Sequence, residues 1–370
     1  MAASAASGAV PTTDGHVPVI DLNKLLELKE GDEASQKAYD EECAKVAKAL
    51  HEYSILIVRD PRVSEADNNG FLDLLEEYFE SPEEERKKDV RKDLSYQVGA
   101  TPSNTELPKD HCERMRAYKD ADKPLSLCPP ERDVKWRFFW RVGERPKDTA
   151  FGELNAEPVV PAGFPAWKDT MDGWGAKLLR AGQDIATMAA TGFGLGATAF
   201  SDRMQHCAHL LAPTASDFKK FGAKGTVLAG FHYDLNFITV HGKSRFPGLF
   251  IWTRQGTKLR VTVPDGCLLM QAGKQMEYLT GGHVKAGFHE VVVVDETAAA
   301  ITAAAEAGRS LWRISSTCFT HIASDATLEP LGVFGEDPEA VAAYPPVLTG
   351  DQVNAELASI NLGAGSTGEA

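Results

Sequence analysis

The sequence predicts an α+β fold that is mainly β, and three observations support this prediction. Short runs of β-branched and aromatic residues recur between Phe200 and Phe319, as is typical of strands. A helical stretch follows that segment at residues 349–360. Apolar residues recur at helical spacing in three stretches before it, at residues 34–53, 65–80 and 165–194. We therefore expect a β-rich core with helices packed against it.

Taken in order, the N-terminal part alternates strands and helices. Residues 1–16 are rich in Ala and Ser, lack a long apolar run, and are expected to form a disordered tail. A strand is expected at Val17–Leu22, and Ser54–Arg59 reads as a second, buried strand that stops at Asp60-Pro61. After the helix at residues 65–80, a serine, a proline and three glutamates at residues 81–85 favour another helix start.

Residues 135–142 form an unusually aromatic run, Lys-Trp-Arg-Phe-Phe-Trp-Arg-Val. One interpretation is a packed hairpin whose rings cover the core, because large aromatic side chains are usually buried. The other interpretation places some of the rings, with Arg137 or Arg141, at the mouth of a substrate site. Both interpretations are open at this point.

Two further runs indicate particular strands of the β-rich segment. Ile251-Trp252 and Leu259–Val263 are separated by Gln255-Gly256 and read as a hairpin. Gly266–Gln271 is apolar almost throughout, which indicates a strand buried on both faces.

The composition is typical of a globular protein and argues against nucleic-acid or membrane partners. Of 370 residues, 43% are hydrophobic and 25% are charged, and the formal net charge is −14. An acidic chain is repelled by nucleic-acid backbones and anionic membranes. The sequence also lacks the run of about 18 apolar residues that a membrane span needs. We expect a cytoplasmic monomer that acts on a small molecule.

The six cysteines are widely spaced and include no C-x-x-C pair. This spacing favours neither a disulfide framework nor a zinc ribbon, so we expect reduced thiols. The cysteines are Cys43, Cys112, Cys128, Cys207, Cys267 and Cys318.

A candidate metal site lies on the run from Gly230 to Val240. This run is β-branched and aromatic, so it reads as a strand, on which residues i and i+2 project from the same face. His232 and Asp234 therefore point the same way. A neutral imidazole beside a carboxylate supplies two ligands of a metal site, and a third must come from elsewhere.

Two downstream histidines, His283 and His289, compete for the third position. His283 sits in a Gly-Gly turn, where its side-chain direction is poorly fixed. His289 begins the run His-Glu-Val-Val-Val-Val, a strongly β-forming stretch that would hold the imidazole on a rigid element. We therefore choose His289. Two histidines and a carboxylate on one side of a metal, with the other side open, are typical of non-haem Fe(II) sites.

A second pair of residues indicates an anion site. Arg313 and Ser315 share a face of the strand-like run from Trp312 to Phe319. A planar guanidinium beside a hydroxyl suits the capture of a small carboxylate. If this strand returns beside the strand that begins at His289, the anion site lies next to the metal.

The five residues occur in the order His-x-Asp, distal His and Arg-x-Ser, as His232, Asp234, His289, Arg313 and Ser315. This order resembles the signature of the Fe(II)/2-oxoglutarate-dependent dioxygenases. The likeness is to the group that includes isopenicillin N synthase and many plant oxygenases, and it extends over most of the chain. Val17–Leu22 resembles the N-terminal Pro-x-Ile-Asp strand of that family. Gly281-Gly282 stands where an Asn-Gly turn often precedes the distal histidine.

This resemblance implies a fold, a division of the chain and a set of cofactors. The fold would be a double-stranded β-helix, or jelly roll, buttressed by N-terminal helices and a C-terminal helix. Within one structural domain, residues 17–195 would form a mixed helical part, 196–335 the catalytic core, and 336–370 a C-terminal loop and helix. The implied cofactors are O2, ascorbate as a reductant, Fe(II) bound by His232, Asp234 and His289, and 2-oxoglutarate bound by Arg313 and Ser315.

The chain departs from the family at two places. The Asn-x-Tyr-Pro-Pro element common upstream of His-x-Asp is absent, and Lys224–Leu228 stands there instead. Arg313 also follows His289 at a longer interval than usual. The excess includes an alanine-rich stretch, residues 298–307, which reads as a helix ended by Gly308. Because the strand from His289 runs away from the metal, we expect this helix at the far end of the barrel.

Three functions are compatible with the sequence. The first is a 2-oxoglutarate-dependent oxygenase that hydroxylates or otherwise oxidises a C–H bond of a small molecule and releases succinate and CO2. The second is an oxidase of the same fold that, like isopenicillin N synthase, does not use 2-oxoglutarate. The third is a non-catalytic jelly-roll binding protein. For the two enzymes, the candidates for lining the substrate cavity are Phe231, Tyr233, Phe237 and Trp252.

Overall fold

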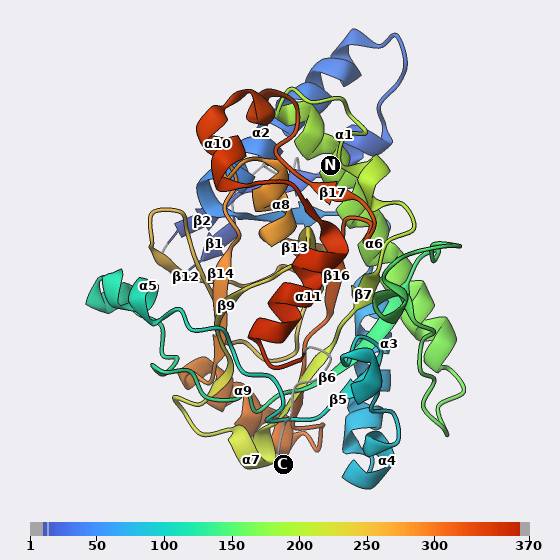
Figure 1. The fold of residues 1–370 in the computed structure, drawn as a ribbon. Coiled ribbons are helices and arrows are strands. Elements are labelled where there is room, and N and C mark those ends of the chain that lie inside the picture. The colour runs from blue at the N-terminus through green and yellow to red at the C-terminus, as the bar shows by residue number, and fades with distance from the viewer. Residues whose placement is uncertain (1–9, 13–14, 363–370) are drawn as a thin grey trace.

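Two β-sheets form the centre of the structure, a computed structural model that describes residues 10–12 and 15–362. The sheets face each other across a cavity, since side chains from both of them line it. Helices surround the sheets on the outside (Figure 1). This arrangement is the mainly β, α+β double-stranded β-helix that the sequence predicts.

The larger sheet has ten strands. All of its pairs are antiparallel except the pair of β3 with β4. Nine strands run in the order β15 (Trp312–Ile314), β8 (Thr214–Asp217), β6 (Trp136–Val142), β7 (His209–Leu211), β16 (Thr317–Thr320), β10 (Ile238–His241), β13 (Cys267–Ala272), β4 (Ile55–Arg59) and β3 (Val19–Asp21), and β5 (Gly99–Thr101) pairs with β6. The N-terminal part of the chain thus completes the sheet that the later strands begin.

The smaller sheet has four antiparallel strands. Their order is β12 (Lys258–Arg260), β11 (Leu249–Trp252), β14 (Phe288–Val292) and β9 (Val227–Tyr233). β11 and β12 form the predicted hairpin, with Ile251 opposite Leu259. Two short pairs lie outside both sheets: β1 (Val10–Thr12) with β2 (Gly15–Val17), and β17 (Thr327–Leu328) with β18 (Val347–Leu348).

Eleven helices are present among the described residues, and those predicted from periodicity occur within a few residues of their expected bounds. They are α1 (Asn23–Leu26), α2 (Glu33–Tyr53), α3 (Glu65–Glu80), α4 (Glu83–Lys87), α5 (Cys112–Ala117), α6 (Trp167–Gly192), α7 (Phe218–Phe221), α8 (Lys274–Leu279), α9 (Asp295–Glu306), α10 (Pro338–Ala343) and α11 (Thr349–Ser359). Five short 3-10 turns lie at Lys92–Leu94, Asp120–Asp122, Gly152–Asn155, Ser201–Met204 and Gly332–Glu336.

Helix α6 packs directly against the larger sheet. A Cβ atom at Gly182 would lie 3.1 Å from Thr320 Cγ2 on β16 and 3.3 Å from Val240 Cγ2 on β10. Helices α2, α3 and α6 share one hydrophobic core with β4, β6 and β10. The helical N-terminal part therefore supports the sheet that carries one wall of the cavity.

Helix α9 lies where the sequence predicts the alanine-rich helix. Along the β9–β14 pair, His232 is opposite His289 at one end and Val227 is opposite Val292 at the other. Helix α9 begins three residues after Val292, at Asp295. It therefore follows the end of the strand pair that is remote from the two histidines (Figure 1).

The structure differs from the sequence-based expectation at three places. Within the expected disordered tail, Val10–Thr12 and Gly15–Val17 pair as β1 and β2; residues 1–9 and 13–14 lie outside the described residues. The aromatic run at residues 136–142 is a single strand, β6, rather than a hairpin, because it pairs along both edges, with β5, β7 and β8. Cys112 and Cys128 form a disulfide, since the chain between them doubles back and brings their Cα atoms to 5.6 Å.

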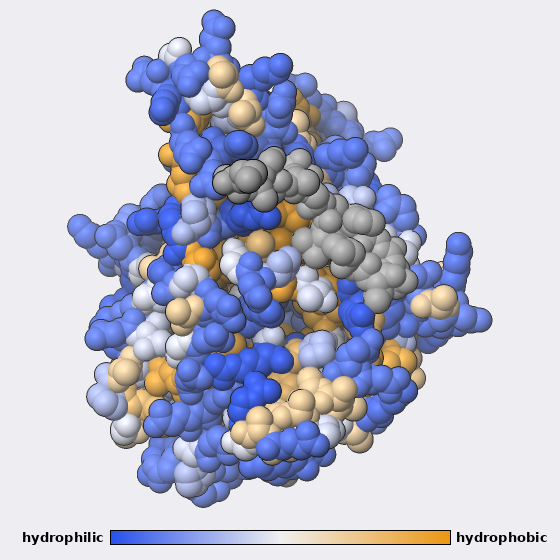
Figure 2. Space-filling view, turned by 180° about the vertical axis from the view of Figure 1, so that it is seen from behind, coloured by the Kyte–Doolittle hydropathy of each residue, from blue (hydrophilic) through white to orange (hydrophobic). Residues whose placement is uncertain are grey.

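Hydrophilic residues cover most of the face shown in Figure 2, with apolar patches between them.

None of the helices in the described part of the chain is long and apolar enough to cross a membrane.

Candidate metal centre

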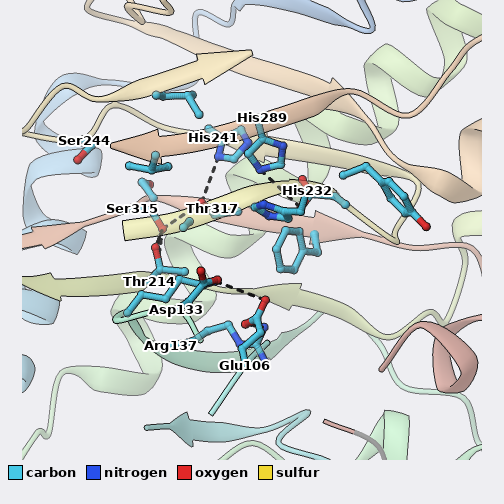
Figure 3. A pocket seen from close by; sticks show the side chains of 18 of the residues that line it. Glu106, Asp133, Arg137, Thr214, His232, His241, Ser244, His289, Ser315 and Thr317 are labelled. Atoms are coloured by element: carbon cyan, nitrogen blue, oxygen red, sulfur yellow. Dashed lines mark hydrogen bonds and ion pairs between the residues drawn. The ribbon is translucent and has the colours of Figure 1, made fainter. Parts of the chain in front are cut away.

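Three side chains, two from the smaller sheet and one from the turn after β9, lie close together. His232 on β9 and His289 on β14 are directly opposite each other across the antiparallel pair, and their ring centroids are 4.2 Å apart (Figure 3). Asp234 follows β9, and its Oδ1 is 3.7 Å from His232 Nε2 and 3.9 Å from His289 Nε2. One ligand atom of each residue lies within 4.8 Å of the others. The three residues could therefore hold one metal ion.

Neighbouring polar groups orient these three side chains. His232 Nδ1 lies 2.5 Å from the carbonyl oxygen of Gly230, which can accept its N–H and leave Nε2 free. Thr239 Oγ1 donates to Asp234 Oδ2 at 2.6 Å, which leaves Oδ1 free. The side-chain amide of Gln271 lies 2.9 Å from His289 Nδ1. Contacts of this kind on the remote atom of each ligand fix the direction of its metal-facing atom.

The environment of His232 favours the neutral imidazole that a metal requires. Burial, followed by the neighbouring His289, lowers the pKa of His232 to about 3, and Asp234 only partly opposes them. A histidine with such a pKa carries no charge at neutral pH. Its Nε2 lone pair is then available as a ligand.

The cavity in front of this triad has a volume of about 390 Å³. Its walls include Arg313 and Ser315, the two predicted anion-binding residues. The strand that carries Arg313 does not lie beside the His289 strand, an arrangement that the sequence leaves open, because β15 pairs with β8 in the larger sheet rather than with β14. Arg313 and Ser315 thus lie on the larger sheet, across the cavity from His232 and His289, instead of beside them in one sheet.

Arg313 is a buried cation without a counter-ion among the described residues. Its side chain is 7% exposed, and burial lowers its pKa to about 10. Its Nε has no hydrogen-bond partner there. A guanidinium in this condition has lost its hydration without gaining an anion, which is costly unless a ligand supplies the anion. Arg313 therefore fits the carboxylate of a small acid.

Ser315, two residues after Arg313, belongs to a row of three hydroxyls on the cavity wall (Figure 3). Its Oγ accepts from the Thr214 N–H at 2.8 Å and lies 2.9 Å from Thr214 Oγ1 and 3.1 Å from Thr317 Oγ1. Thr317 Oγ1 in turn lies 3.1 Å from Nδ1 of the half-buried His241, whose buried Nε2 has no partner among the described residues. Thr214 and His241 were not identified from the sequence. The signal for His241 was its spacing of two from Thr239, which places both on the cavity face of β10.

A chain of four charged side chains forms another wall of the cavity, and no local pattern in the sequence marks it as a unit. Lys135 Nζ pairs with Asp133 and lies 3.4 Å from Glu106 Oε1, and Arg137 Nη1 donates to Glu106 Oε2 at 2.9 Å. Asp133 Oδ1 also accepts from the Gly230 N–H at 2.9 Å, two residues before His232. Arg137 and Phe139 line the cavity, so the interpretation of residues 135–142 as part of a substrate site stays a prediction for this side of β6.

Of the four predicted substrate residues, only Tyr233 lines the cavity. Phe231 stacks on Phe288 on the other face of the smaller sheet. Its ring also packs edge-to-face against Trp252, with the ring centroids 4.8 Å apart. Phe237 is fully buried in the main core against Phe200. Phe231 lies on the face opposite His232 because neighbours in a strand alternate. Tyr233 also packs against Phe288 on that face, but it is the last residue of β9 and lines the cavity from there.

His283, the alternative third ligand, lies elsewhere. Its ring stacks on His51 at 4.2 Å, and its carbonyl oxygen accepts from Arg254 at 2.6 Å. His289 is thus the histidine that the structure brings to His232 and Asp234.

Two family models match the chain in sequence. The first, described as the N-terminal part of non-haem dioxygenases in morphine synthesis, matches residues 17–151. The second, described as the 2OG-Fe(II) oxygenase superfamily, matches residues 204–322. Together they cover more than half of the chain, and the second includes all five signature residues. No curated protein matches the chain.

Solved structures with the same fold are similar over almost the whole chain. A 2OG-Fe(II) oxygenase family protein from Caulobacter crescentus is 19% identical, with a TM-score of 0.68, over 92% of this chain and 98% of that one. A full-length protein from Neurospora crassa, solved in complex with alpha-KG, is 17% identical, with a TM-score of 0.71, over 96% and 100%. The dioxygenase for auxin oxidation from rice is 17% identical, with a TM-score of 0.61, over 93% and 96%. At these identities the likeness shows the fold alone.

These findings confirm the predicted fold and cofactors. The sheets, the matched sequence models and the His-Asp-His group all agree with an oxygenase that uses Fe(II), 2-oxoglutarate and O2. The chain belongs to the Fe(II)/2-oxoglutarate-dependent oxygenase superfamily.

Proposed function

We propose that this protein oxidises a C–H bond of a small-molecule substrate, with 2-oxoglutarate as the co-substrate that is converted into succinate and CO2. The observation that carries the proposal is the occurrence, in one cavity, of a three-residue metal site and a buried cation without a counter-ion among the described residues. The first supports Fe(II) binding by His232, Asp234 and His289. The second supports binding of the distal carboxylate of 2-oxoglutarate by Arg313 and Ser315.

Each group has a defined task in this scheme. Fe(II), when bound, supplies the activation of O2 that is coupled to oxidative decarboxylation of 2-oxoglutarate. His232, Asp234 and His289 would hold the ion through two imidazole nitrogens and one carboxylate oxygen. Arg313 provides a paired set of N–H donors and the Ser315 hydroxyl an additional one, so the co-substrate is oriented as well as bound.

The cavity supports a small substrate. Its volume of about 390 Å³ lies in the range of small-molecule pockets. Relatives of the same fold bind small molecules: the Neurospora crassa protein has been solved with thymine and with 5-formyluracil, and JOX2 with 2OG, Fe and JA. We also propose residues 196–335 as the catalytic core, because the five signature residues fall within it, whereas residues 17–195 and 336–370 contribute further wall residues.

The test is a turnover assay on the full-length protein with Fe(II) and 2-oxoglutarate under air. We expect succinate to form, at a rate that rises when an oxidisable substrate is added. O2 consumption without succinate, with every substrate tried, would replace this proposal with an oxidase that does not use 2-oxoglutarate. A His232→Ala variant with unchanged metal content and unchanged function would instead support a non-catalytic binding protein.

A further inference from the structure

Arg137 lines the cavity and has a pair of N–H donors without partners among the described residues. It lies on β6, is 7% exposed, and uses Nη1 to donate to Glu106. Its Nε and Nη2 are buried and have no hydrogen-bond partner among the described residues. These two N–H groups lie on one edge of the guanidinium and project in parallel, which matches the two oxygens of a carboxylate.

The surrounding charges balance, two acids against two bases, and leave Arg137 with unpaired donors at one end of the chain of four. The chain of four alternates in sign, from Asp133 through Lys135 and Glu106 to Arg137. Burial raises the pKa of Glu106, but Lys135 and Arg137 outweigh it and bring that pKa down to about 2, so this carboxylate is charged at neutral pH. Asp133, at the other end, forms an ion pair with Lys135 and accepts a hydrogen bond from the N–H of Gly230. Arg137 is the terminal member, and an anion on its open edge would continue the alternation.

The position of this edge is suitable for a substrate. Arg137 is directly opposite Thr214 across the β6–β8 pair, and Thr214 carries the hydrogen bonds to Ser315. At the other end of the chain of four, the Gly230 N–H donates to Asp133, and the Gly230 carbonyl oxygen accepts from His232 Nδ1. The charged chain therefore spans the wall between the proposed metal site and the proposed 2-oxoglutarate anchor (Figure 3).

Apolar side chains adjoin the open edge. The guanidinium of Arg137 lies over the ring of Phe139, 4.0 Å from its centroid. Phe139 packs with Leu210 and Phe319, and all three line the cavity. A ligand whose anionic end is held by Arg137 would thus place its body against an apolar surface.

We propose that Arg137 binds the carboxylate of the substrate side-on, which assigns the substrate to the small organic acids with an apolar body. This inference rests on the proposed oxygenase function, since it names the substrate of that site. Glu106 acts as a positioning residue, because it fixes the rotation of the guanidinium through Nη1 and keeps the other edge open.

The experiment compares matched acids and amides on the full-length protein loaded with Mn(II) and 2-oxoglutarate. The probes are hexanoate and 3-phenylpropanoate, each with its primary amide, and the readout is the calorimetric Kd. We expect at least one acid to bind, and its amide to bind about 10- to 100-fold more weakly, as is usual for hydrogen bonds to charged groups. Equal affinity of acid and amide, or no measurable binding of either acid, overturns the inference.

Arg137→Lys keeps the charge and removes the paired donors. We expect it to weaken acid binding about 10- to 100-fold and to leave the Kd of 2-oxoglutarate unchanged. The control is Arg141→Lys on the same strand, because Arg141 is buried but donates to the Val142 carbonyl instead of lining the cavity. A loss of 2-oxoglutarate affinity with intact acid binding would assign Arg137 to the co-substrate and overturn the inference.

The proposed function is checked separately by succinate formation in the wild-type protein, without added acid and with every substrate tried. Absence of succinate together with selective acid binding would contradict the oxygenase function and retain the acid site. Succinate formation without any preference for the acids over their amides would support the oxygenase function and contradict the acid site.

Discussion

His232 and His289 are direct cross-strand partners on β9 and β14, with ring centroids 4.2 Å apart. The register of this one strand pair therefore determines whether the metal site exists. A shift of the register by one residue would turn one of the two imidazoles to the opposite face of the sheet. The hydrophobic packing that fixes the register, such as Phe231 against Phe288, is thus part of the support of the site.

Replacing one of these histidines should remove the metal. We expect His289→Ala to lower iron content and succinate formation by more than the 10- to 100-fold that is typical when only a supporting group is lost. Metal analysis after dialysis against Fe(II) measures the first effect and a turnover assay the second. His283→Ala is the matched control and should retain both, because its ring stacks on His51. Equal iron in the two variants would contradict the assignment.

Replacing Arg313 should separate stability from co-substrate binding. In Arg313→Met, a buried charge without a described counter-ion is removed, so the free protein should be as stable as the wild type or more stable, by about 1–4 kcal/mol. At the same time 2-oxoglutarate should no longer raise the melting temperature, whereas it stabilises the wild type by mass action. Thermal unfolding with and without the co-substrate measures both effects. Arg309→Lys, at an exposed position, is the control and should behave as the wild type does.

Thr239 should raise the metal affinity although it is not itself a metal ligand. Its hydroxyl donates to Asp234 Oδ2 at 2.6 Å, so Thr239→Val removes the group that directs Oδ1 towards the histidines. We expect metal affinity to fall about 10- to 100-fold. Thr239→Ser keeps the hydroxyl and should restore the affinity. If both variants bind iron equally well, the hydroxyl has no orienting role.

Glu106 should contribute stability that depends on pH. Its pKa is lowered to about 2 in the folded protein, compared with about 4.3 in an unfolded chain. A carboxyl whose pKa falls on folding stabilises the protein above the unfolded pKa, and this contribution disappears as the pH drops towards the folded pKa. Glu106→Gln should therefore be destabilised at pH 7, by about 3 kcal/mol because Lys135 and Arg137 lose their buried anion. Its stability should also fall less steeply between about pH 4.5 and pH 2. Chemical unfolding as a function of pH, with the exposed Glu131→Gln as control, tests this expectation.

The sequence was sufficient to predict the His-Asp-His group, because local rules determined it. The spacing of two placed His232 and Asp234 on one face, and the β-forming run after His289 distinguished it from His283. The same alternation rule places Phe231 on the opposite face, so its prediction as a cavity residue was wrong, whereas Tyr233 lines the cavity from the end of β9. Phe237 and Trp252 are likewise outside the cavity.

The remaining parts of the site depend on long-range pairing that local patterns do not reveal. Glu106 reaches Arg137 only because the loop after β5 returns along β6, and Thr214 reaches Ser315 only because β8 pairs with β15. The disulfide between Cys112 and Cys128 depends in the same way on how the chain between them folds back. Widely spaced residues of these types carry no periodic signal.

The most direct measurement is a crystal structure of the protein with iron and N-oxalylglycine, a non-reactive analogue of 2-oxoglutarate. The account predicts one anomalous iron peak bound by His232, Asp234 and His289, with the distal carboxylate of the analogue paired to Arg313 and the open edge of Arg137 still vacant. Iron bound at any other residues, or an analogue whose distal carboxylate lies away from Arg313, would contradict it.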